Sequence, residues 1–243
     1  FILVFLPCAL IGFHVLGIKA GGKAARNFLV AMSLFFYGWW NPVYIVLIIT
    51  SILFNYGVGS VLASEIKFSS KKVALQCGVC INILTLAYFK YTNFFLENLS
   101  DVAGLSLQQE QIVLPLAISF FTFQQIAYLV DTYKGTVESH KFSEYCLFVT
   151  FFPQLIAGPI LRAKELIPLL KKKIIFTNAN VKFGILLFMI GFIKKIFLAD
   201  SISNFIDPIF EKENLIASDD YIKGFLLFPL QIYFDFSGYV DMA

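Results

Sequence analysis

The chain has 243 residues, of which 58% are hydrophobic and only 14% are charged, and its mean hydropathy is +0.78. Soluble domains usually carry about 25% charged residues, so the composition argues against a soluble domain and indicates a protein of the lipid bilayer. The formal net charge of +3 requires no acidic partner, because lysine and arginine collect in the cytoplasmic loops of membrane proteins. We therefore expect no nucleic-acid partner.

Apolar runs of bilayer-spanning length follow one another along the chain. A transmembrane helix needs about 20 predominantly apolar residues. The candidate runs are 1–18, 28–62, 73–90, 113–130, 145–161, 183–199 and 221–240. Between them we find no soluble domain, and we interpret 97–111 and 211–220 as ordinary connecting loops.

The run 28–62 is too long for one crossing, and the segment Trp39-Trp40-Asn41-Pro42 interrupts it. Proline disfavours helix at the residue before it, and indole rings favour the headgroup level. We therefore predict a helical hairpin made of 28–39 and 43–62. Its first arm is short for a complete crossing.

The run 145–161 differs from the others because basic residues lie at both of its ends. It also contains Pro153-Gln154 and Gly158-Pro159, which break regular helix. Irregular backbone is tolerated at membrane depth only where it is buried in protein or lines a water-filled cavity. We predict a re-entrant segment with both ends in the cytoplasm. The expected fold is all-α, a polytopic transmembrane protein with about seven crossings plus this segment, in one domain over 1–243.

The sequence contains four cysteines, Cys8, Cys77, Cys80 and Cys146. All four lie within apolar runs, and Cys77 and Cys80 form a C-x-x-C. A zinc or redox role is one interpretation of that spacing. We favour small apolar packing residues, because no second ligand pair is nearby, and we expect no metal site.

Polar side chains inside the apolar runs are the candidates for function, because ionisable and amide groups in hydrocarbon are costly unless they are paired or functional. Within 119–131, the residues Gln124, Tyr128 and Asp131 share one helical face. Hydrogen bonding between helices or, for Asp131, a position at the headgroup level is enough to explain this group.

Two further polar groups are harder to explain by packing alone. Two prolines, a glycine and an amide interrupt 151–162, which suits a broken element beside a cavity, with Arg162 placed to meet an anion or an acidic side chain. In 231–241, two carboxylates and several hydroxyls lie among phenylalanines. The alternative is that Asp235 pairs with a basic residue such as Arg162 only to hold the bundle together. We assign as substrate-tunnel or support residues Gln154, Arg162, Gln231, Asp235, Ser237, Tyr239 and Asp241.

Three ordered motifs carry a resemblance to a known family. They are LPLAISFFTFQ at 114–124, FFPQLIAGPI at 151–160 and YFDFSGYVDMA at 233–243. In this order and spacing they resemble the membrane-bound O-acyltransferases, specifically the branch that acetylates alginate. The segment 88–95 and the pair Lys194-Lys195 also fit that branch, so the resemblance covers essentially the whole chain.

The resemblance implies an enzyme of the bacterial inner membrane that transfers an acetyl or other acyl group to hydroxyls of an extracytoplasmic polysaccharide such as alginate. It implies acetyl-CoA or a derived acetyl carrier as the donor substrate, no bound cofactor, and periplasmic or extracellular partner proteins that deliver the acceptor. Alternatives are a polytopic transporter or channel, a structural membrane subunit, and D-alanyl transfer to a cell-wall polymer.

The catalytic base is not expected among these residues. The family's two hallmark histidines lie C-terminal to the segment that matches 233–243, and this sequence ends before both, so we interpret it as an N-terminal part that is inactive alone. His14 stands alone in the first apolar run and His140 lies in a charged loop. A histidine without a visible acid or nucleophile is more often structural, so neither is a candidate catalyst.

Overall fold

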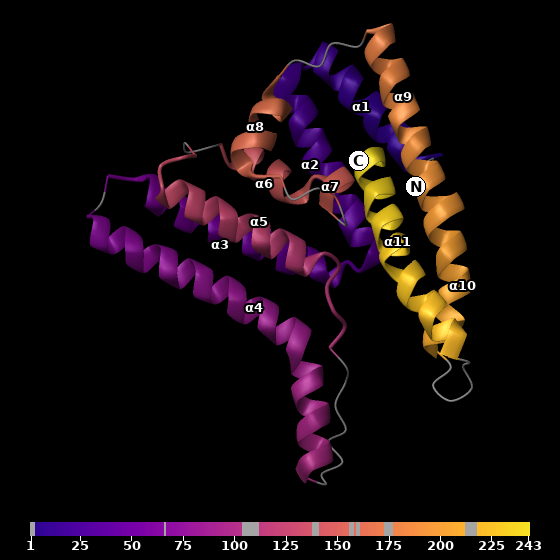
Figure 1. The fold of residues 1–243 in the computed structure, drawn as a ribbon. Coiled ribbons are helices and arrows are strands. Elements are labelled where there is room, and N and C mark those ends of the chain that lie inside the picture. The colour runs from indigo at the N-terminus through magenta and orange to yellow at the C-terminus, as the bar shows by residue number, and fades with distance from the viewer. Residues whose placement is uncertain are drawn as a thin grey trace. The chain divides into compact units, whose positions relative to one another are not determined.

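The computed structural model describes residues 3–65, 67–103, 112–137, 141–155, 158, 161–172, 177–211 and 218–243. Every regular element in these ranges is a helix (Figure 1), which confirms the all-α prediction. The chain divides into two compact units, Phe1–Ile156 with Ile160–Lys173, and Ala157–Pro159 with Ile174–Ala243. We describe each unit by itself.

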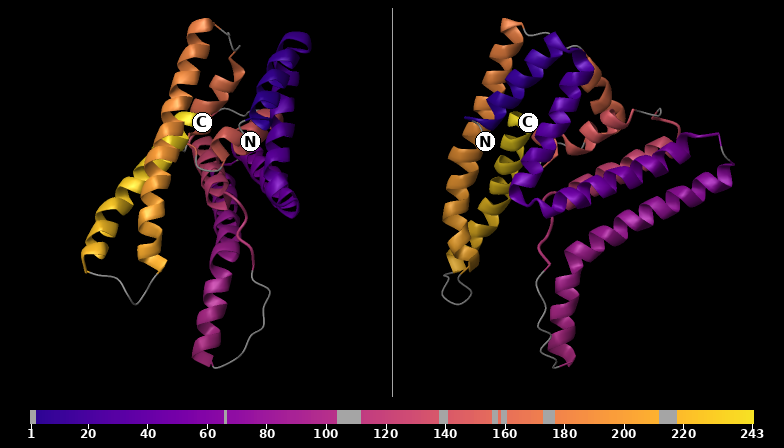
Figure 2. Two further views of the ribbon diagram at one scale, coloured as in Figure 1. Left: turned by 90° about the vertical axis from the view of Figure 1, so that its right-hand side faces the viewer. Right: turned by 180° about the vertical axis from the view of Figure 1, so that it is seen from behind.

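The first unit is built from helices of very unequal length. They are α1 (Phe5–Lys19), α2 (Gly21–Trp40), α3 (Val43–Ala63), α4 (Phe68–Ala103), α5 (Ile118–Tyr133), α6 (Phe142–Thr150), α7 (Phe152–Leu155) and α8 (Ala163–Lys171). Helices α1 and α2 pack as a pair, and α5 packs against both α3 and α4 (Figure 2). The core contains large side chains that are almost fully buried, among them Tyr37, Ile48, Leu129, Tyr145 and Phe148.

The predicted break at Asn41-Pro42 is found, with one correction to the first helix, whereas a hairpin of two membrane crossings stays a prediction. Asn41 is extended, with φ −156° and ψ 109°, and its Oδ1 accepts a hydrogen bond of 3.0 Å from the Val43 N–H at the start of α3. The first arm is not short, however, because α2 begins at Gly21 and has 20 residues. The polar residues before the apolar run continue the helix, since loss of hydropathy does not by itself end a helix.

Helix α4 is also longer than its apolar run. The prediction gave 73–90, whereas the helix has 36 residues and continues to Ala103, so the interpretation of 97–103 as loop was wrong. At 1.5 Å per residue such a helix is roughly 50 Å long, more than the hydrocarbon thickness of about 30 Å. Figure 2 shows that α4 bends in its C-terminal half.

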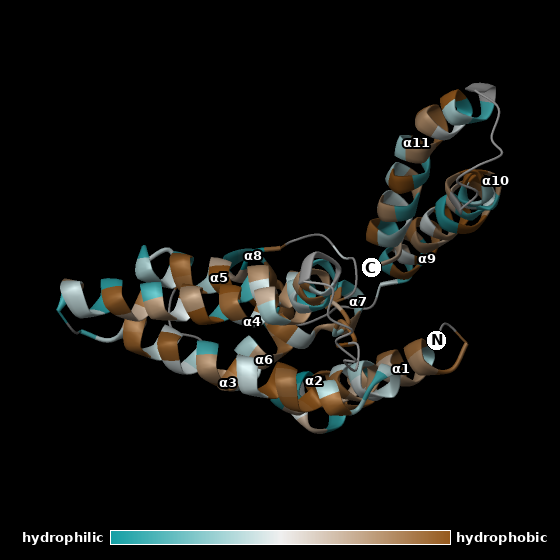
Figure 3. Cartoon of the chain, turned by 90° about the horizontal axis from the view of Figure 1, so that it is seen from below, coloured by the Kyte–Doolittle hydropathy of each residue, from teal (hydrophilic) through white to brown (hydrophobic). Residues whose placement is uncertain are grey.

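Two helices in the described ranges are long and apolar enough to cross a bilayer, Val43–Ala63 and Phe68–Ser100. Apolar residues occur on all sides of α3 (Figure 3): Ile48 is buried, while Val46 and Leu53 are exposed. A helix that is apolar all round is typical of a protein interior or a bilayer. The count of seven crossings and the re-entrant segment stay predictions.

The second unit is a helical hairpin. Helix α9 (Asn178–Ile193) continues through a π-helical segment, η1 (Lys194–Ala199), into α10 (Asp200–Glu211). Helix α11 (Ser218–Met242) packs back along all three in the opposite direction (Figure 1). The column formed by α9, η1 and α10 extends beyond the predicted run 183–199 at both ends. Of the predicted loop 211–220, residues 212–217 lie outside the described residues.

Candidate functional site

The third predicted polar group lies on α11, and its spacing distributes it around that helix. Gln231 and Tyr239 are each four residues from Asp235 and therefore share its face. Asp235 and Asp241 are each three residues from Gly238, and each three-residue step falls about 60° short of a full turn. Gly238 therefore lies midway between the two carboxylates on the helix surface.

At Gly238 the backbone of α11 lies very close to that of its neighbour. A Cβ atom at Gly238 would lie 2.8 Å from the Gly191 carbonyl oxygen and 3.0 Å from the Lys195 backbone nitrogen. A Cβ atom at Gly191 would in turn lie 2.5 Å from the Gly238 carbonyl oxygen. Only glycine allows the two backbones to be this close, and small residues at such crossings are characteristic of helix packing in membranes.

Lys194, three residues after Gly191 in the sequence, lies on one side of this crossing. Its Nζ donates to Ser237 Oγ at 3.0 Å and to Asp241 Oδ2 at 2.6 Å. Ser237 and Asp241 are four residues apart and so present their oxygens on one face of α11. The lysine and its carboxylate partner keep only 27% and 22% of their side-chain surface exposed. These contacts are charge-assisted, which makes them stronger than neutral hydrogen bonds.

Lys195 reaches the other side of the crossing. Its Nζ lies 2.5 Å from Asp235 Oδ1 and 2.9 Å from Asp200 Oδ1. Asp200 is five residues further along the same chain, and its N–H donates to the Lys195 carbonyl oxygen. A five-residue repeat is the hydrogen-bond pattern of a π-helix, which occurs often at functional sites. The π-helical segment thus brings Asp200 to the same ammonium group as Asp235.

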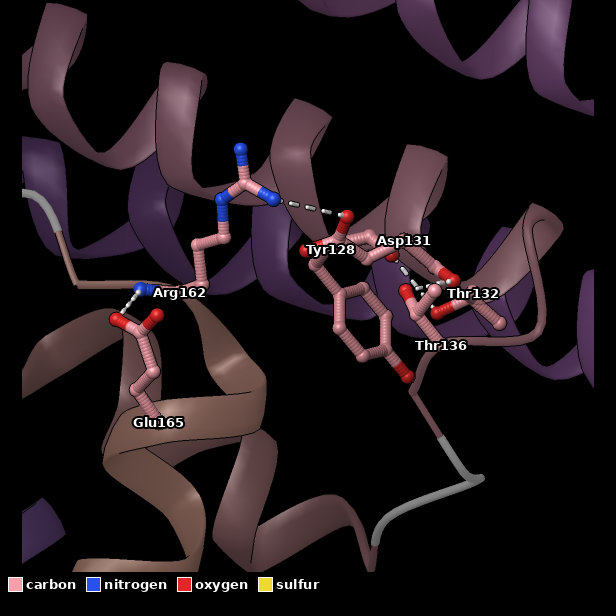
Figure 4. Close-up of polar contacts among 6 residues, drawn as sticks. All are labelled: Tyr128, Asp131, Thr132, Thr136, Arg162 and Glu165. Atoms are coloured by element: carbon pink, nitrogen blue, oxygen red, sulfur yellow. Dashed lines mark hydrogen bonds and ion pairs between the residues drawn. The ribbon is translucent and has the colours of Figure 1, made fainter.

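The basic partner of Asp235 is therefore Lys195 rather than Arg162, the partner suggested from sequence. Arg162 instead lies in the first unit, where its Nη1 is 3.8 Å from Asp131 Oδ1 (Figure 4). The Arg162 side chain is 57% exposed, whereas Asp131 is 9% exposed. Asp131 thus has an ion-pair partner, and the headgroup-level position expected for it stays a prediction. The pair joins the end of α5 to the residue that precedes α8.

The second predicted polar group is a broken helical element. Helix α6 ends at Thr150, Phe151 leaves the helical conformation with ψ 105°, and α7 starts at Phe152. Pro153 lies in the first turn of α7, where its missing N–H costs no helical hydrogen bond. Of the predicted break at Gly158-Pro159, only Gly158 is among the described residues.

A buried serine on α2 completes this break. Ser33 is fully buried, and its Oγ accepts a hydrogen bond of 3.2 Å from the Phe152 N–H. The first N–H groups of a helix have no partner within the helix, so the hydroxyl replaces water at this buried start. Gln154 is the third residue of α7 and is 5% exposed. Sequence analysis did not identify Ser33, since nothing local distinguishes it from other serines in apolar runs.

Sequence analysis also missed a network of amides between α3, α4 and α5. Asn55 Nδ2 donates to Gln125 Oε1 at 2.5 Å and to Asn82 Oδ1 at 3.1 Å. Asn82 Nδ2 returns a bond of 2.6 Å to Asn55 Oδ1. Ser51 and Tyr145 donate to the same oxygen of Gln125. The signal was available, because asparagine inside an apolar run needs a partner on another helix.

The predicted site residues thus fall into separate places. Asp235, Ser237 and Asp241 meet the two lysines in the second unit, and Gln231 and Tyr239 share the face of Asp235. Gln154 and Arg162 belong to the first unit. His14 is exposed on α1, and His140 lies outside the described residues. Within the described ranges, no group of three or more His, Cys, Asp and Glu side chains could hold a metal ion.

Comparison with known proteins identifies homologues of the chain. No protein-family model matches it. It is 37% identical over its whole length to a peptidoglycan O-acetyltransferase of Helicobacter pylori, covering 51% of that protein. It is 36% identical to "Probable alginate O-acetylase AlgI" of Pseudomonas aeruginosa, covering 47%, and 35% identical to the protein of the same name from Azotobacter vinelandii, covering 49%. The chain spans about half the length of these relatives. Identity at this level along the entire chain shows that it is homologous to these O-acetylases, the group of membrane-bound O-acyltransferases that its motifs resemble.

Proposed function

We propose that the full-length protein is an O-acetyltransferase of the bacterial inner membrane that acetylates hydroxyl groups of an extracytoplasmic polysaccharide. The observation that carries this proposal is the identity of 36–37% over the whole chain to proteins named for peptidoglycan and alginate O-acetylation. Two helices of bilayer-spanning length and apolarity are consistent with a membrane location.

The acceptor class follows from what the two relatives share. Peptidoglycan and alginate are different polymers, but both offer sugar hydroxyls outside the cytoplasm. The identities of 37% and 36% do not separate them, so the proposal names a polysaccharide hydroxyl, with alginate and peptidoglycan as the two acceptors to test. Extracytoplasmic partner proteins present the acceptor, and the donor is acetyl-CoA or an acetyl carrier derived from it.

The chemistry requires a base that removes the proton of the acceptor hydroxyl as it attacks the acyl carbonyl. We assign that base to the half of the protein that this chain does not align with. The residues of this chain support the reaction. Asp235, with Gln231 and Tyr239 on the same face of α11, lines the substrate path. Gln154 and Arg162 do the same in the first unit, where Arg162 offers an exposed guanidinium to an anionic donor.

Acetyl transfer by the full-length protein in proteoliposomes tests this proposal. Labelled acetyl-CoA, or membrane extract as the source of an acetyl carrier, is supplied on one side, and peptidoglycan fragments or alginate oligomers on the other. Base-labile label on either polymer supports the function and identifies the acceptor. Passage of donor or acceptor across the bilayer without any acetyl ester formed would show a transporter instead.

The variant Asp235→Asn tests whether a residue of this chain takes part in acetyl transfer. The variant should insert at near-normal abundance and lose most acetyl transfer, because the amide keeps the shape of the side chain but loses the charge that Lys195 binds. Lys182→Met is the matched control, since Lys182 is an exposed residue of α9 and should leave activity unchanged. A fully active Asp235→Asn protein would remove Asp235 from the site.

A further inference from the structure

We propose that Lys194 and Lys195 are positioning residues for the acyl transfer proposed above, and that together they hold the polar motif of α11 in register from both sides of the Gly191–Gly238 crossing. We call these two residues the lysine clamp. The inference rests on the proposed function for its effect on rate, while the clamp itself can be tested without any activity.

The spacing of the polar motif places one carboxylate on each side of the crossing. Asp235 and Asp241 flank Gly238 at three residues on each side, so the two carboxylates diverge around the line of closest approach. A single cation could not serve both. Lys194 binds Asp241 on one side and Lys195 binds Asp235 on the other. Rotation of α11 in either direction would therefore stretch one of these ion pairs.

The backbone positions of Lys194 and Lys195 place both lysines at the crossing itself. Lys194 Cβ would lie 3.2 Å from a Cβ atom placed at Gly238, and the Lys195 backbone nitrogen would lie 3.0 Å from it. The clamp is thus fixed at the crossing by backbone contact, and its side chains need only reach around one helix. The π-helical segment begins at Lys194, so the two residues start the turn that brings Asp200 back to Lys195 Nζ.

The charged groups at the crossing depend on both lysines for their counter-ions. Two ammonium groups face three carboxylates, those of Asp200, Asp235 and Asp241. Without Lys195, the carboxylates of Asp200 and Asp235 would be left at the same place with no cation between them, and like charges at short range repel. Lys195 therefore holds the two carboxylates together and ties Asp235, on the face of α11 shared with Gln231 and Tyr239, to the neighbouring helix.

The contrast with Lys223 separates this arrangement from an ordinary surface pair. Lys223 binds Asp220, three residues away on the same helix, and so constrains only that helix. Exposure does not separate the two kinds of pair, because Lys195 and Asp235 are 39% and 46% exposed while Lys223 and Asp220 are 54% and 41% exposed. The clamp instead joins residues 40 to 47 positions apart in sequence, on two helices. Its geometry acts on the placement of α11, which is the role of a positioning residue.

The experiment uses the full-length protein in proteoliposomes and compares Lys194→Met, Lys195→Met and Lys195→Arg with the controls Lys182→Met and Lys223→Met. Each Met variant of the clamp should lower kcat about 10- to 100-fold, because displacement by about 1 Å can cost about 100-fold in rate. The KM for the donor should stay within about twofold, as expected when ground-state binding is unaffected. Lys195→Arg should recover most of the rate, and both controls should behave as wild type.

A charge exchange gives a readout that does not need activity. Lys195→Asp combined with Asp235→Lys should recover the Tm in detergent that either single variant loses, which shows direct coupling between the two positions. If the exchange recovers Tm but not kcat, the carboxylate at position 235 is required for the reaction and Lys195 positions it, as proposed.

Three results would overturn the inference. They are wild-type kcat in both Met variants, a fall in kcat that merely follows loss of folded protein across all variants, and absence of coupling in Tm between positions 195 and 235. Failure of the proposed function has a different signature. In that case the wild-type protein transfers no acetyl group to either polymer, while the coupling in Tm still decides whether the clamp exists.

Discussion

The two units are stabilised by different kinds of contact. The first unit buries large aromatic and aliphatic side chains and joins its helices through neutral amides such as Asn55 and Asn82, with ion pairs only around α8 within the described ranges. In the second unit, the buried residues within the described ranges are Gly158, Gly191, Ala199, Ile206, Gly224 and Gly238, and ion pairs are prominent among the polar contacts between its helices. Large apolar side chains such as Phe183 and Phe225 remain exposed there, at 65% and 77%.

This difference shows two ways of fixing the relative orientation of packed helices where burial of apolar surface does not favour one orientation over another. Lipid tails are as apolar as leucine, so helices in a bilayer associate through close packing and polar contacts. In the first unit, the helix orientations are set by side chains that interlock and share hydrogen bonds. In the second unit, they are set by the close backbone contact at two glycines and by the ion pairs on either side of it.

Gly238→Ala should have the largest effect, because it acts on the crossing itself. The added methyl would lie 2.8 Å from the Gly191 carbonyl oxygen, and overpacking of this kind typically costs about 1–3 kcal/mol. Separation of the helices should also draw the lysine clamp away from its carboxylates, so acetyl transfer by the full-length protein should fall at least about tenfold, as for a misplaced group.

Gly184→Ala is the control for this crossing, since a Cβ atom there meets nothing within 4 Å. It should be neutral or stabilising by up to about 1 kcal/mol, the helix-propensity difference between alanine and glycine. Thermal unfolding in detergent and the acetylation assay measure both variants. Equal behaviour of the two alanine variants would contradict the close approach of α9 and α11.

Asn55→Ala should have the next largest effect, on stability rather than on rate. It removes partners from Asn82 and Gln125, both of which are buried. A buried polar group left without its partner costs about 1–3 kcal/mol, although hydrogen bonds between membrane helices average only about 0.6 kcal/mol. Ser60→Ala is the control, because the Ser60 hydroxyl bonds only to its own helix, at the Tyr56 carbonyl. Equal Tm values for the two variants would show that the amide network contributes nothing.

Ser33→Ala should have a smaller and more local effect. It leaves the Phe152 N–H without the hydroxyl that accepts its hydrogen bond, at a cost of about 1 kcal/mol. Hydrogen exchange should therefore speed up at Phe152 and the start of α7, with little change in α3 or α4. Ser64→Ala, at an exposed position after α3, is the control. Unchanged exchange at Phe152 would show that Ser33 does not support the break.

The smallest perturbation concerns topology, and it tests the re-entrant segment. Lys141 and Lys164 are both exposed, on either side of the broken element. Single cysteines at these positions, in the full-length protein without its native cysteines, should leave activity unchanged and should react with an impermeant reagent from the same side. Labelling from opposite sides would make the segment a true crossing and reverse the orientation of everything after it.

A helix end could be predicted from the sequence where a residue such as proline forces it locally. Pro42 restricts the residue before it, and Asn41 is extended as expected. Helix ends without such a cause were missed, because α2 and α4 continue through polar residues that only reduce hydropathy. The polar motif of α11 was also found from sequence, since carboxylates among phenylalanines are conspicuous wherever they lie.

The partners within the site could not be predicted in the same way. Asp235 was expected to meet a basic residue, but sequence distance does not distinguish Lys195 from Arg162. The choice depends on the glycine crossing, which places residue 195 beside residue 238, and on a π-helical turn that has no reliable sequence signal. Ser33 was missed for the same reason, because its partner Phe152 is 119 residues away.

The π-helical segment has a further consequence for how this chain can vary. Its hydrogen bonds span five residues instead of four, so Lys194–Ala199 contains one residue more than an α-helical turn would need. Deletion of the exposed residue Leu198 would return the helix to regular form, in which Asp200 stands four residues after Lys195, the spacing at which side chains of an α-helix still meet. The five-residue turn takes up its extra residue locally, so α10 and its fully buried Ile206 should keep their register. A homologue with a one-residue gap here should therefore keep the same pattern of apolar residues on α10.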